Sequence, residues 1–197
     1  MKLVFATHNQ NKVKEVQDIL PENISLLSLT DIGCTQEIPE TGKTLEENAI
    51  LKADYVTKNY GFPCFADDTG LLVTKLDGAP GVYSARYAGV KANADDNMGK
   101  LLQALIAKKD RSARFETVIA LNINNEQHLF KGKVEGEIIH EKRGNKGFGY
   151  DPIFKPLGYT KTFAELPLEV KNKISHRGKA IQQLIKYLNS LVHDTRQ

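Results

Sequence analysis

Apolar runs and helical repeats alternate in the first part of the chain. Leu3 to Ala6 is a nearly continuous apolar run, which is typical of a strand buried on both faces. Apolar residues then recur at helical spacing from Val13 to Leu20, so the polar residues Thr7 to Lys12 are predicted to be a strand-to-helix loop. Such a loop is either an ordinary connection or an anion site, because N–H groups at a helix start carry partial positive charge. Ile24 to Leu29 predicts a second strand.

A long polar segment and a capped helix follow. Thr30 to Gly42 is rich in carboxylates and has no helical period, so it is predicted to be a loop. Thr44 and Glu47 have the spacing of a capping box, and the helix that they begin should end near Gly61. Lys52 lies at the edge of the apolar face of this helix. We expect its ammonium to snorkel into solvent, although a position facing a cleft is the alternative.

The stretch Phe65 to Leu71 is predicted to be a central strand that runs out into a polar site. A short apolar lead-in is followed by Asp67, Asp68, Thr69 and Gly70. Neighbouring side chains of an extended strand point to opposite faces, so Asp67 and Asp68 cannot have the same role. One carboxylate would face a cleft while the other orients its neighbours. The alternative is a turn with solvated carboxylates.

The middle of the chain predicts a helix and a hairpin. Apolar residues at helical spacing from Met98 to Ile106 indicate an amphipathic helix. Phe115 to Ile123 and Leu129 to Ile139 read as two strands joined around the turn signal Asn124-Asn125. Strands and helices are therefore mixed in an α/β chain, and part of the sheet is antiparallel.

The last third contains a glycine-rich loop and an interrupted helix. Gly144 to Pro152 carries two aromatic residues and a carboxylate between glycines, which allow close approach of the backbone to a ligand. Leu166 to Leu191 is predicted to be helical with a break near Ser175 to Gly178, where His176 and Arg177 come together. The alternatives are a surface turn whose aromatic residues fold onto the core, and a solvated helix face.

Composition narrows the classes of protein. The 197 residues are 41% apolar and 26% charged with a formal net charge of +3, as in an ordinary globular protein, and we expect one compact unit. No apolar run is long enough to span a bilayer, and the first residues do not form a signal peptide, so we expect a cytoplasmic protein that is not membrane-bound. The scattered positive residues do not indicate nucleic-acid binding. Cys34 and Cys64 are expected to be buried thiols.

Six motifs in order resemble the inosine triphosphate pyrophosphatase family, whose members hydrolyse non-standard purine nucleoside triphosphates to monophosphate and pyrophosphate. They are Thr7-x-Asn9-x-x-Lys12-x-x-Glu15, Glu40-Thr41-Gly42 with Glu47-Asn48-Ala49, Ala66-Asp67-Asp68-Thr69-Gly70-Leu71, Gly78-Ala79-Pro80-Gly81-Val82-Tyr83-Ser84-Ala85-Arg86, Gly147-Phe148-Gly149-Tyr150-Asp151-Pro152, and Lys171 before Ser175-His176-Arg177. The resemblance spans the chain. It implies that residues 1–197 form a single nucleoside triphosphate pyrophosphatase domain of mixed α+β class, an elongated mixed sheet with flanking helices forming two lobes around a central cleft. It also implies a homodimer.

The resemblance assigns roles to individual residues. Asp68 would be the general base and a Mg²⁺ ligand, with Glu40 as the second carboxylate near the metal. The residues that would hold the triphosphate are Thr7, His8, Asn9, Gln10, Asn11, Lys12, Thr69 and Lys171. Those that would hold the purine base are Phe148, Gly149, Tyr150, Asp151, His176 and Arg177. His8 stands where many relatives have Gly, and Thr69 stands where Ser is common, although threonine keeps the hydroxyl.

Physical chemistry agrees with these assignments. A nucleoside triphosphate brings about four negative charges, so its site needs cations, N–H donors and a hard divalent ion. Water attacking the α-phosphorus would release pyrophosphate, and an aspartate in reach could accept the proton. One alternative is a phosphatase with Asp68 as nucleophile, but the sequence lacks the Asp-x-Asp-x-Thr arrangement of such enzymes. The other is a nucleotide or nucleic-acid binder without turnover, in which Phe148 and Tyr150 would stack on bases.

Overall fold

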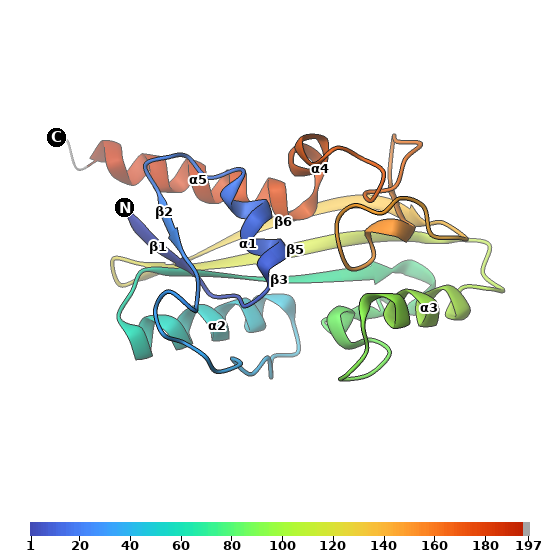
Figure 1. Cartoon of the computed structure of the whole chain (residues 1–197), viewed down its shortest axis with the longest axis horizontal. Coiled ribbons are helices and arrows are strands. Elements are labelled where there is room, and N and C mark those ends of the chain that lie inside the picture. Colours follow the sequence, from blue (N-terminus) through green and yellow to red (C-terminus); the bar gives the residue numbers. More distant parts are fainter. Residues whose placement is uncertain (195–197) are drawn as a thin grey trace. The chain divides into compact units, whose positions relative to one another are not determined.

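The protein has a mixed α+β fold built on one seven-stranded sheet, seen in a computed structural model that describes residues 1–194 (Figure 1). The strand order is β2-β1-β3-β5-β6-β7, and β4 pairs with β3. β1 is parallel to β2 and β3, whereas β4 is antiparallel to β3 and β7 is antiparallel to β6. The strands are β1 Lys2–Phe5, β2 Ser25–Leu27, β3 Cys64–Val73, β4 Pro80–Gly81, β5 Ser112–Ile123, β6 Glu126–Ile138 and β7 Phe154–Pro156. The α-helices are α1 Gln10–Gln17, α2 Leu45–Tyr60, α3 Ala94–Ala104, α4 Leu168–Ile174 and α5 His176–Asp194.

The chain forms two compact units, rather than the single compact unit expected from its length and composition. The first consists of Met1–Asp68, Thr117–Gly132 and Arg177–Gln197, and the second consists of Thr69–Glu116 and Lys133–His176. The chain passes from one unit to the other within β3, β5 and β6 and at the start of α5. Each unit has its own apolar core.

The core of the first unit joins its strands to α1 and α5. Phe5 of β1 stacks on Phe65 of β3 with ring centroids 4.5 Å apart, and Leu3, Val16 and Leu184 belong to the same cluster. Figure 1 shows α1 and α5 on one side of these strands and α2 on the other. The predicted apolar face of α2 is confirmed, since its four members are buried: Leu45, Ala49, Ala53 and Val56.

The core of the second unit is built around α3 and aromatic residues. Met98 and Leu101 of α3, and Leu105 directly after it, are buried there with residues of β3 and β5, as the periodicity predicts. Ile106 corrects the end of the predicted repeat, because the helix stops at Ala104 and Ile106 is exposed. Phe115 of β5 makes an edge contact with Phe154 of β7, with ring centroids 4.7 Å apart. The apolar spacing of α3 therefore fixes which face it buries.

The loop after β1 is shorter than predicted. α1 begins at Gln10, so Gln10 to Lys12 are helical rather than loop residues. The reason is the side chain of Asn9, which caps the helix by accepting from the N–H groups of Asn11 and Lys12. The helix also ends at Gln17, before Leu20, the last residue of the predicted repeat.

The central strand does not end at the two aspartates, which corrects the prediction of a strand running out into a polar site. β3 continues from Cys64 to Val73, so Asp67 and Asp68 lie in its middle. Beyond them, Leu71 and Leu72 pair with β4, which extends the strand. The charged side chains are tolerated there because each has hydrogen-bond partners, as described below.

Three predicted boundaries are confirmed in more detail. Thr44 caps α2 by accepting from the Glu47 N–H, but the Glu47 carboxylate accepts from Lys43 N–H, so the reciprocal half of the predicted capping box is shifted by one residue. α2 ends at Gly61, whose φ of 72° is left-handed. The hairpin turn has φ of 52° at Asn124 and 63° at Asn125, as a two-residue turn with a primed geometry requires.

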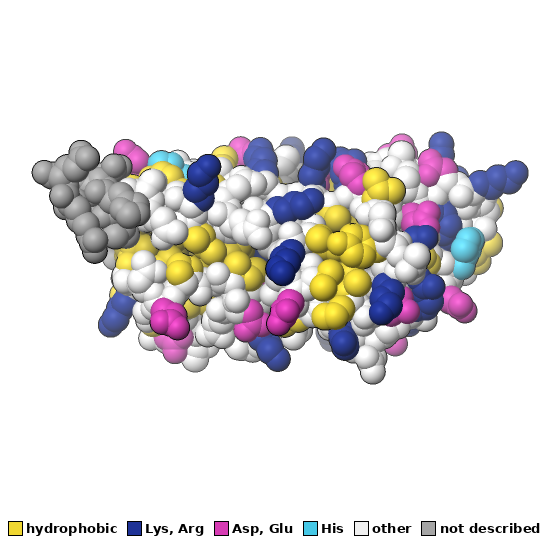
Figure 2. All heavy atoms as spheres, turned by 90° about the horizontal axis from the view of Figure 1, so that it is seen from above, with side chains coloured by type: hydrophobic (Ala, Val, Ile, Leu, Met, Phe, Trp, Pro, Cys, Tyr) yellow, Lys and Arg dark blue, Asp and Glu magenta, His cyan; other side chains and the backbone are white. Residues whose placement is uncertain are grey.

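The remaining expectations concern the helix break, the cysteines and the surface. Ser175 separates α4 from α5, close to the predicted break. Cys34 and Cys64 are buried free thiols, as expected. Among the described residues, no helix combines the length and apolar character needed to cross a membrane. Figure 2 shows Lys and Arg side chains interspersed with Asp and Glu side chains over the viewed face, in keeping with the scattered charges of the sequence.

Candidate functional site

Asp67 holds two cations, one on each carboxylate oxygen. Nζ of Lys12 lies 2.8 Å from Oδ1, and Nε of Arg177 lies 3.1 Å from Oδ2. Nη1 of Arg177 also donates to Oε2 of Glu15 at 2.6 Å. Asp67, Arg177 and Glu15 are buried. The result is a buried chain of alternating charges that joins α1, β3 and the first turn of α5.

The charges around Asp67 keep it ionised. Burial by itself raises the pKa of Asp67, but the coulombic attraction of Lys12 and Arg177 outweighs burial and holds the pKa well below its usual range. Burial likewise lowers the pKa of Arg177, and Asp67 and Glu15 more than offset that effect. The Asp67 carboxylate is thus ionised at neutral pH, between two cations.

Asp68 points to the opposite face of β3 and contacts residues of α2. Its Oδ2 accepts from Nδ2 of Asn48 at 3.0 Å, and its Oδ1 lies 3.8 Å from Nζ of Lys52. The same ammonium donates to Oε1 of Glu40 at 2.6 Å and to the backbone carbonyl of Asp67 at 2.7 Å. The two carboxylates therefore have different partners on different elements, as the predicted opposite directions of the two side chains require.

The prediction for Lys52 is wrong. It does not snorkel into solvent, because its side chain is 8% exposed and its ammonium lies between the carboxylates of Glu40 and Asp68. Burial lowers the pKa of Lys52, but Asp68 and then Glu40 more than offset this, so the pKa is raised and the side chain stays charged. The attraction of these two carboxylates explains why the ammonium stays inside.

The pKa of Asp68 is displaced upward. Burial is the largest cause and the nearby Glu40 carboxylate adds to it, while Lys52 opposes both. A carboxylate with a raised pKa holds a proton more readily than an exposed aspartate does, which suits a general base. Adjacent carboxylates whose pKa values are driven apart are typical of acid–base sites.

Asn48 connects Asp68 to the loop that contains Glu40. Its Oδ1 accepts from the N–H of Gly42 at 2.8 Å while its Nδ2 donates to Asp68. A Cβ atom at Gly42 would lie 2.7 Å from Oδ1 of Asn48, so this close approach requires glycine. The amide therefore fixes the orientation of the Asp68 carboxylate.

The segment Thr7 to Lys12 uses most of its backbone donors internally. Thr7 Oγ1 accepts from Asn9 N–H, and the Asn9 side chain accepts from Asn11 and Lys12 N–H. Within the described part of the chain, the N–H groups of His8 and Gln10 have no acceptor. His8 also reaches the carboxylate-rich loop, since its Nε2 lies 3.1 Å from the carbonyl of Gln36.

The residues around Asp68 fit a hard divalent cation. Glu40 and Asp68 come from different segments, and both carboxylates lie near the ammonium of Lys52, at 2.6 and 3.8 Å. Residues 1–194 contain no group of three His, Cys, Asp or Glu side chains placed to hold a metal. An ion here would take its other ligands from water and substrate, as Mg²⁺ bound through one or two carboxylates does.

The second unit gathers residues predicted to bind the base. Nζ of Lys171 donates to Oδ2 of Asp151 at 2.7 Å, and that oxygen also accepts from Phe148 N–H at 2.8 Å. The Lys171 ammonium lies 5.0 Å from the centroid of the Phe148 ring. Tyr150 is buried and its hydroxyl donates to the carbonyl of Ser84. Lys171, predicted to hold phosphate, thus contacts residues predicted to hold the base.

Glycines shape this loop. Gly147 has a φ of 72°, and a Cβ atom there would lie 2.1 Å from Oδ2 of Asp151. Gly149 has a φ of 63°, but a Cβ atom there would meet no atom within 4 Å. Gly147 is therefore required both by its backbone and by the close carboxylate, whereas Gly149 is required by its backbone alone.

The other predicted residues are also located. The ring of His176 stacks on Phe115, with centroids 4.5 Å apart and planes inclined by 15°. Arg177 belongs to the charge chain with Asp67 and Glu15. Thr69 follows Asp68 in β3 and is half-buried. The structure brings Lys12, Arg177 and the aspartates together in the first unit, and Phe148, Asp151 and Lys171 together in the second.

Sequence reasoning placed Glu15 and Asn48 in motifs without giving either a role, and it gave Lys52 a position facing a cleft only as the alternative. A signal for two of them was present, because Asn48 and Lys52 are four residues apart on a helix and therefore lie on one face. That face is otherwise buried and apolar, so a buried polar pair on it indicates a partner. Glu15 gave no comparable signal, since a glutamate on a short helix is usually exposed.

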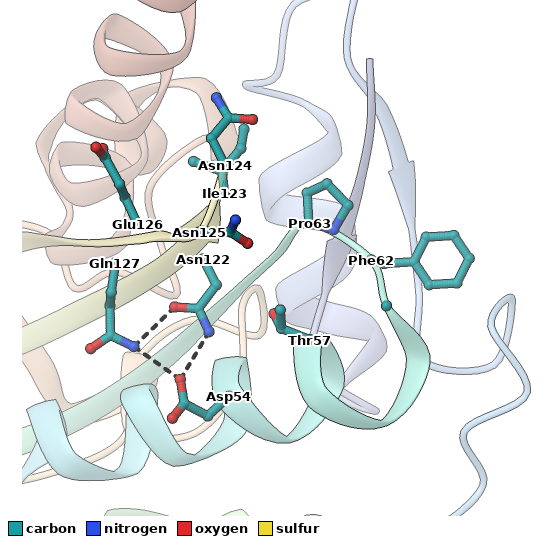
Figure 3. A pocket seen from close by; sticks show the side chains of 11 residues that line it. Asp54, Thr57, Phe62, Pro63, Asn122, Ile123, Asn124, Asn125, Glu126 and Gln127 are labelled. Carbon is teal, nitrogen blue, oxygen red and sulfur yellow. Dashed lines mark hydrogen bonds between the residues drawn. The ribbon is translucent and has the colours of Figure 1, made fainter.

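A hollow of about 350 Å³ lies at the hairpin end of the first unit, away from the predicted residues (Figure 3). Asn122 and Gln127 from the two hairpin strands both point at Asp54 of α2, and their amides donate to its Oδ1 at 2.9 and 3.0 Å. Lys58 donates to the other oxygen at 2.9 Å. The donors and acceptors of these side chains are paired with one another, so the network connects α2 to the β5–β6 hairpin.

Comparisons with known proteins agree with the motifs. The family model described as the Ham1 family matches residues 3–187. A dITP/XTP pyrophosphatase of Flavobacterium johnsoniae is 63% identical over 190 residues, which cover 96% of this chain and 99% of that protein. The enzyme of the same name from Bacillus subtilis is 49% identical over 191 residues, 95% of this chain and 96% of that protein.

Solved structures share the fold. The Ham1 protein of Coxiella burnetii superimposes with a TM-score of 0.89 at 43% identity, covering 96% of this chain and 99% of that one. The Ham1 protein of Staphylococcus aureus gives a TM-score of 0.88 at 41% identity with the same coverage.

Proposed function

Because the chain belongs to the Ham1 family, we propose that it hydrolyses non-standard purine nucleoside triphosphates, ITP, dITP and XTP, to the monophosphate and pyrophosphate. The family predicted from the motifs is confirmed by the match over residues 3–187 and by relatives named dITP/XTP pyrophosphatase. The observation that carries the proposal for this chain is Asp68, a buried carboxylate of raised pKa beside Lys52 and Glu40.

In this proposal, Asp68 acts as the general base. It accepts a proton from the water that attacks the α-phosphorus, and the bond from the α-phosphorus to the bridging oxygen breaks, so pyrophosphate leaves. Asn48 holds one oxygen of Asp68 by a hydrogen bond of 3.0 Å, which leaves Oδ1 to face the ammonium of Lys52. A fixed carboxylate lowers the cost of reaching the reactive geometry.

We further propose that Glu40 and Asp68 hold Mg²⁺. When bound, the ion would neutralise the charge that develops on the departing phosphate oxygens. The proposal is supported by the two carboxylates that converge on Lys52 and by the preference of Mg²⁺ for few protein ligands. Chelation with EDTA should abolish turnover, and added Mg²⁺ should restore it.

The remaining residues would bind the substrate, one group holding its phosphates and the other its purine base. Lys12 and the free N–H groups of His8 and Gln10 would contact phosphate oxygens, together with Thr69 and Lys171. The base would lie on Phe148 and be held by Asp151, His176 and Arg177. These roles rest on the family resemblance, and the ion pairs of Lys12 and Lys171 keep both ammonium groups positioned.

One assay tests the function directly. The protein is incubated with Mg²⁺ and ITP, XTP, dITP, GTP or ATP, and pyrophosphate is measured separately from phosphate. We expect pyrophosphate and monophosphate in equal amounts from the non-standard nucleotides. Inosine diphosphate appearing before the monophosphate would mean cleavage at the γ-phosphorus and would overturn the proposal. A trapped phosphoenzyme would instead support Asp68 as a nucleophile.

The assembly and compartment stay predictions. We propose a homodimer in the cytoplasm, on the resemblance and on the composition of the chain. Light scattering after gel filtration should give twice the mass of the 22.0 kDa chain.

A further inference from the structure

Asp67 has a place in the site that the proposed mechanism does not use. It lies in the middle of β3 and is 1% exposed. Its two oxygens are divided between Lys12, in the first turn of α1, and Arg177, in the first turn of α5. One carboxylate therefore ties the starts of two helices to the central strand, next to the proposed base.

Lys12 needs such a contact to hold one position. A lysine side chain has up to about 2 kcal/mol of rotamer entropy to lose, and its ammonium is a point charge without fixed direction. In the described residues, Asp67 is the acceptor of the one hydrogen bond that Lys12 Nζ makes. Two of its three N–H donors thus remain for a ligand.

We propose that Asp67 is a positioning residue, which presents the ammonium of Lys12 to the phosphates of the substrate. The identity of that substrate rests on the proposed function above. Asp67 would act through Lys12, without touching the substrate itself. Glu15 binds Arg177 from the other side and has no part in this positioning.

Two roles of Asp67 predict opposite results for Asp67→Asn. If the carboxylate only lowered the local positive charge, its removal would strengthen the binding of an anion. If it positions Lys12, its removal weakens binding even though the site becomes more positive. We expect kcat/KM for ITP to fall about ten- to hundredfold, the worth of a charged hydrogen bond, and KM to rise. A lower KM would overturn the proposal.

A double-mutant cycle separates positioning from general damage to the fold. In the Lys12→Met background, Asp67→Asn should change kcat/KM by less than about threefold, because the residue through which it acts is gone. A purely structural role would give the same factor in both backgrounds, and that outcome would refute the proposal.

Glu15→Gln is the matched control. Like Asp67→Asn, it removes one buried carboxylate that binds Arg177. In the described part of the protein, however, Glu15 makes no contact with Lys12. Its effect on kcat/KM should therefore multiply with that of Lys12→Met. Should Asp67→Asn fail to fold, Asp67→Glu takes its place in the cycle, since it keeps the charge that Arg177 needs and moves the carboxylate by one methylene.

A binding measurement keeps this inference separate from the proposed function. Calorimetry with inorganic triphosphate in EDTA gives Kd for the four members of the cycle, which are the wild type, the two single variants and the double variant, with no turnover required. We expect the same pattern of weakening and coupling in Kd. If the wild type fails to hydrolyse ITP but the coupling is present, the proposed function fails and the positioning role stands. If ITP is hydrolysed but Asp67→Asn changes Kd by the same factor with and without Lys12→Met, the positioning role is refuted and the proposed function stands.

Discussion

Asp67 and Asp68 are consecutive residues of β3, yet the pKa of the first is lowered and the pKa of the second is raised. Both are buried, and burial raises the pKa of each. The difference comes from their neighbours, because Asp67 faces two cations whereas Asp68 shares one ammonium with a second carboxylate. The alternation of side chains along one strand thus produces an anchor and a candidate base one residue apart.

Asp68→Asn should lower kcat for ITP by about two to four powers of ten, because an amide cannot accept the proton. Circular dichroism should show an unchanged fold, since asparagine has the size of aspartate. The matched control is Asp54→Asn, the same substitution in the hairpin network, which should leave kcat within about twofold. Turnover of Asp68→Asn within a few-fold of wild type would remove Asp68 from the mechanism.

Lys52→Met should destabilise the protein by about 3 kcal/mol, because it leaves the carboxylates of Glu40 and Asp68 without their shared cation. Urea unfolding measures this change. Lys58→Met on the same helix is the control. The ion pair of Lys58 with Asp54 is exposed, with 74% of the lysine side chain accessible, so its loss should cost less than about 1 kcal/mol. If both variants lose the same free energy of unfolding, burial of the Lys52 ion pairs does not add to their contribution to stability.

Gly147→Ala should weaken ITP binding and raise KM by about tenfold or more, because the new methyl group would displace Oδ2 of Asp151 from Lys171 and Phe148 N–H. Gly149→Ala separates this contact from backbone strain. It has the same left-handed φ but open space around its Cβ, so it should cost about 1 kcal/mol of stability and no more. If Gly149→Ala raises KM as much as Gly147→Ala does, the approach of Asp151 is not what selects Gly147.

Arg177 tests how the base is recognised. Hypoxanthine and xanthine carry a 6-carbonyl that accepts hydrogen bonds, and adenine carries an amino group there, so ATP should be a poor substrate. Arg177→Lys keeps the charge that Asp67 and Glu15 need but loses the forked donor. If Arg177 reads the carbonyl, the ratio of kcat/KM for ITP to that for ATP should fall about tenfold. An unchanged ratio would show that Arg177 does not read the base and only pairs with Asp67 and Glu15.

The stability of the hairpin network should depend on pH through Asp54. Burial raises the pKa of Asp54, but donors from Asn122 and Lys58 outweigh it, so the pKa lies below its ordinary value. This stabilisation is present above the unfolded pKa, about 3.9, and is lost as the pH falls through the lower folded pKa. Asp54→Asn should therefore cost about 1 kcal/mol at pH 7 and less below pH ~3. Urea unfolding at both pH values checks this, and a constant difference would contradict it.

The sequence by itself determined the elements and the family. Apolar spacing located α2 and α3, Asn124-Asn125 located the hairpin turn, and Gly61 located a helix end, because these signals are local and act through backbone conformation and periodicity. The opposite directions of Asp67 and Asp68 also followed from local geometry, since a strand alternates. Six motifs in order were enough to recognise the family and its reaction.

Only the tertiary structure decided the partners of the charged residues. Glu15 and Arg177 are 162 residues apart, and Asp67 and Arg177 are 110 apart, so no local rule could pair them. The burial of Lys52 was missed for the same reason, because it depends on Glu40 arriving from a loop without periodicity. β3 was predicted to end too early because the residues that satisfy its carboxylates lie on other elements. Local conformation is encoded in neighbouring residues, whereas the electrostatics of a buried site depends on groups that folding brings together.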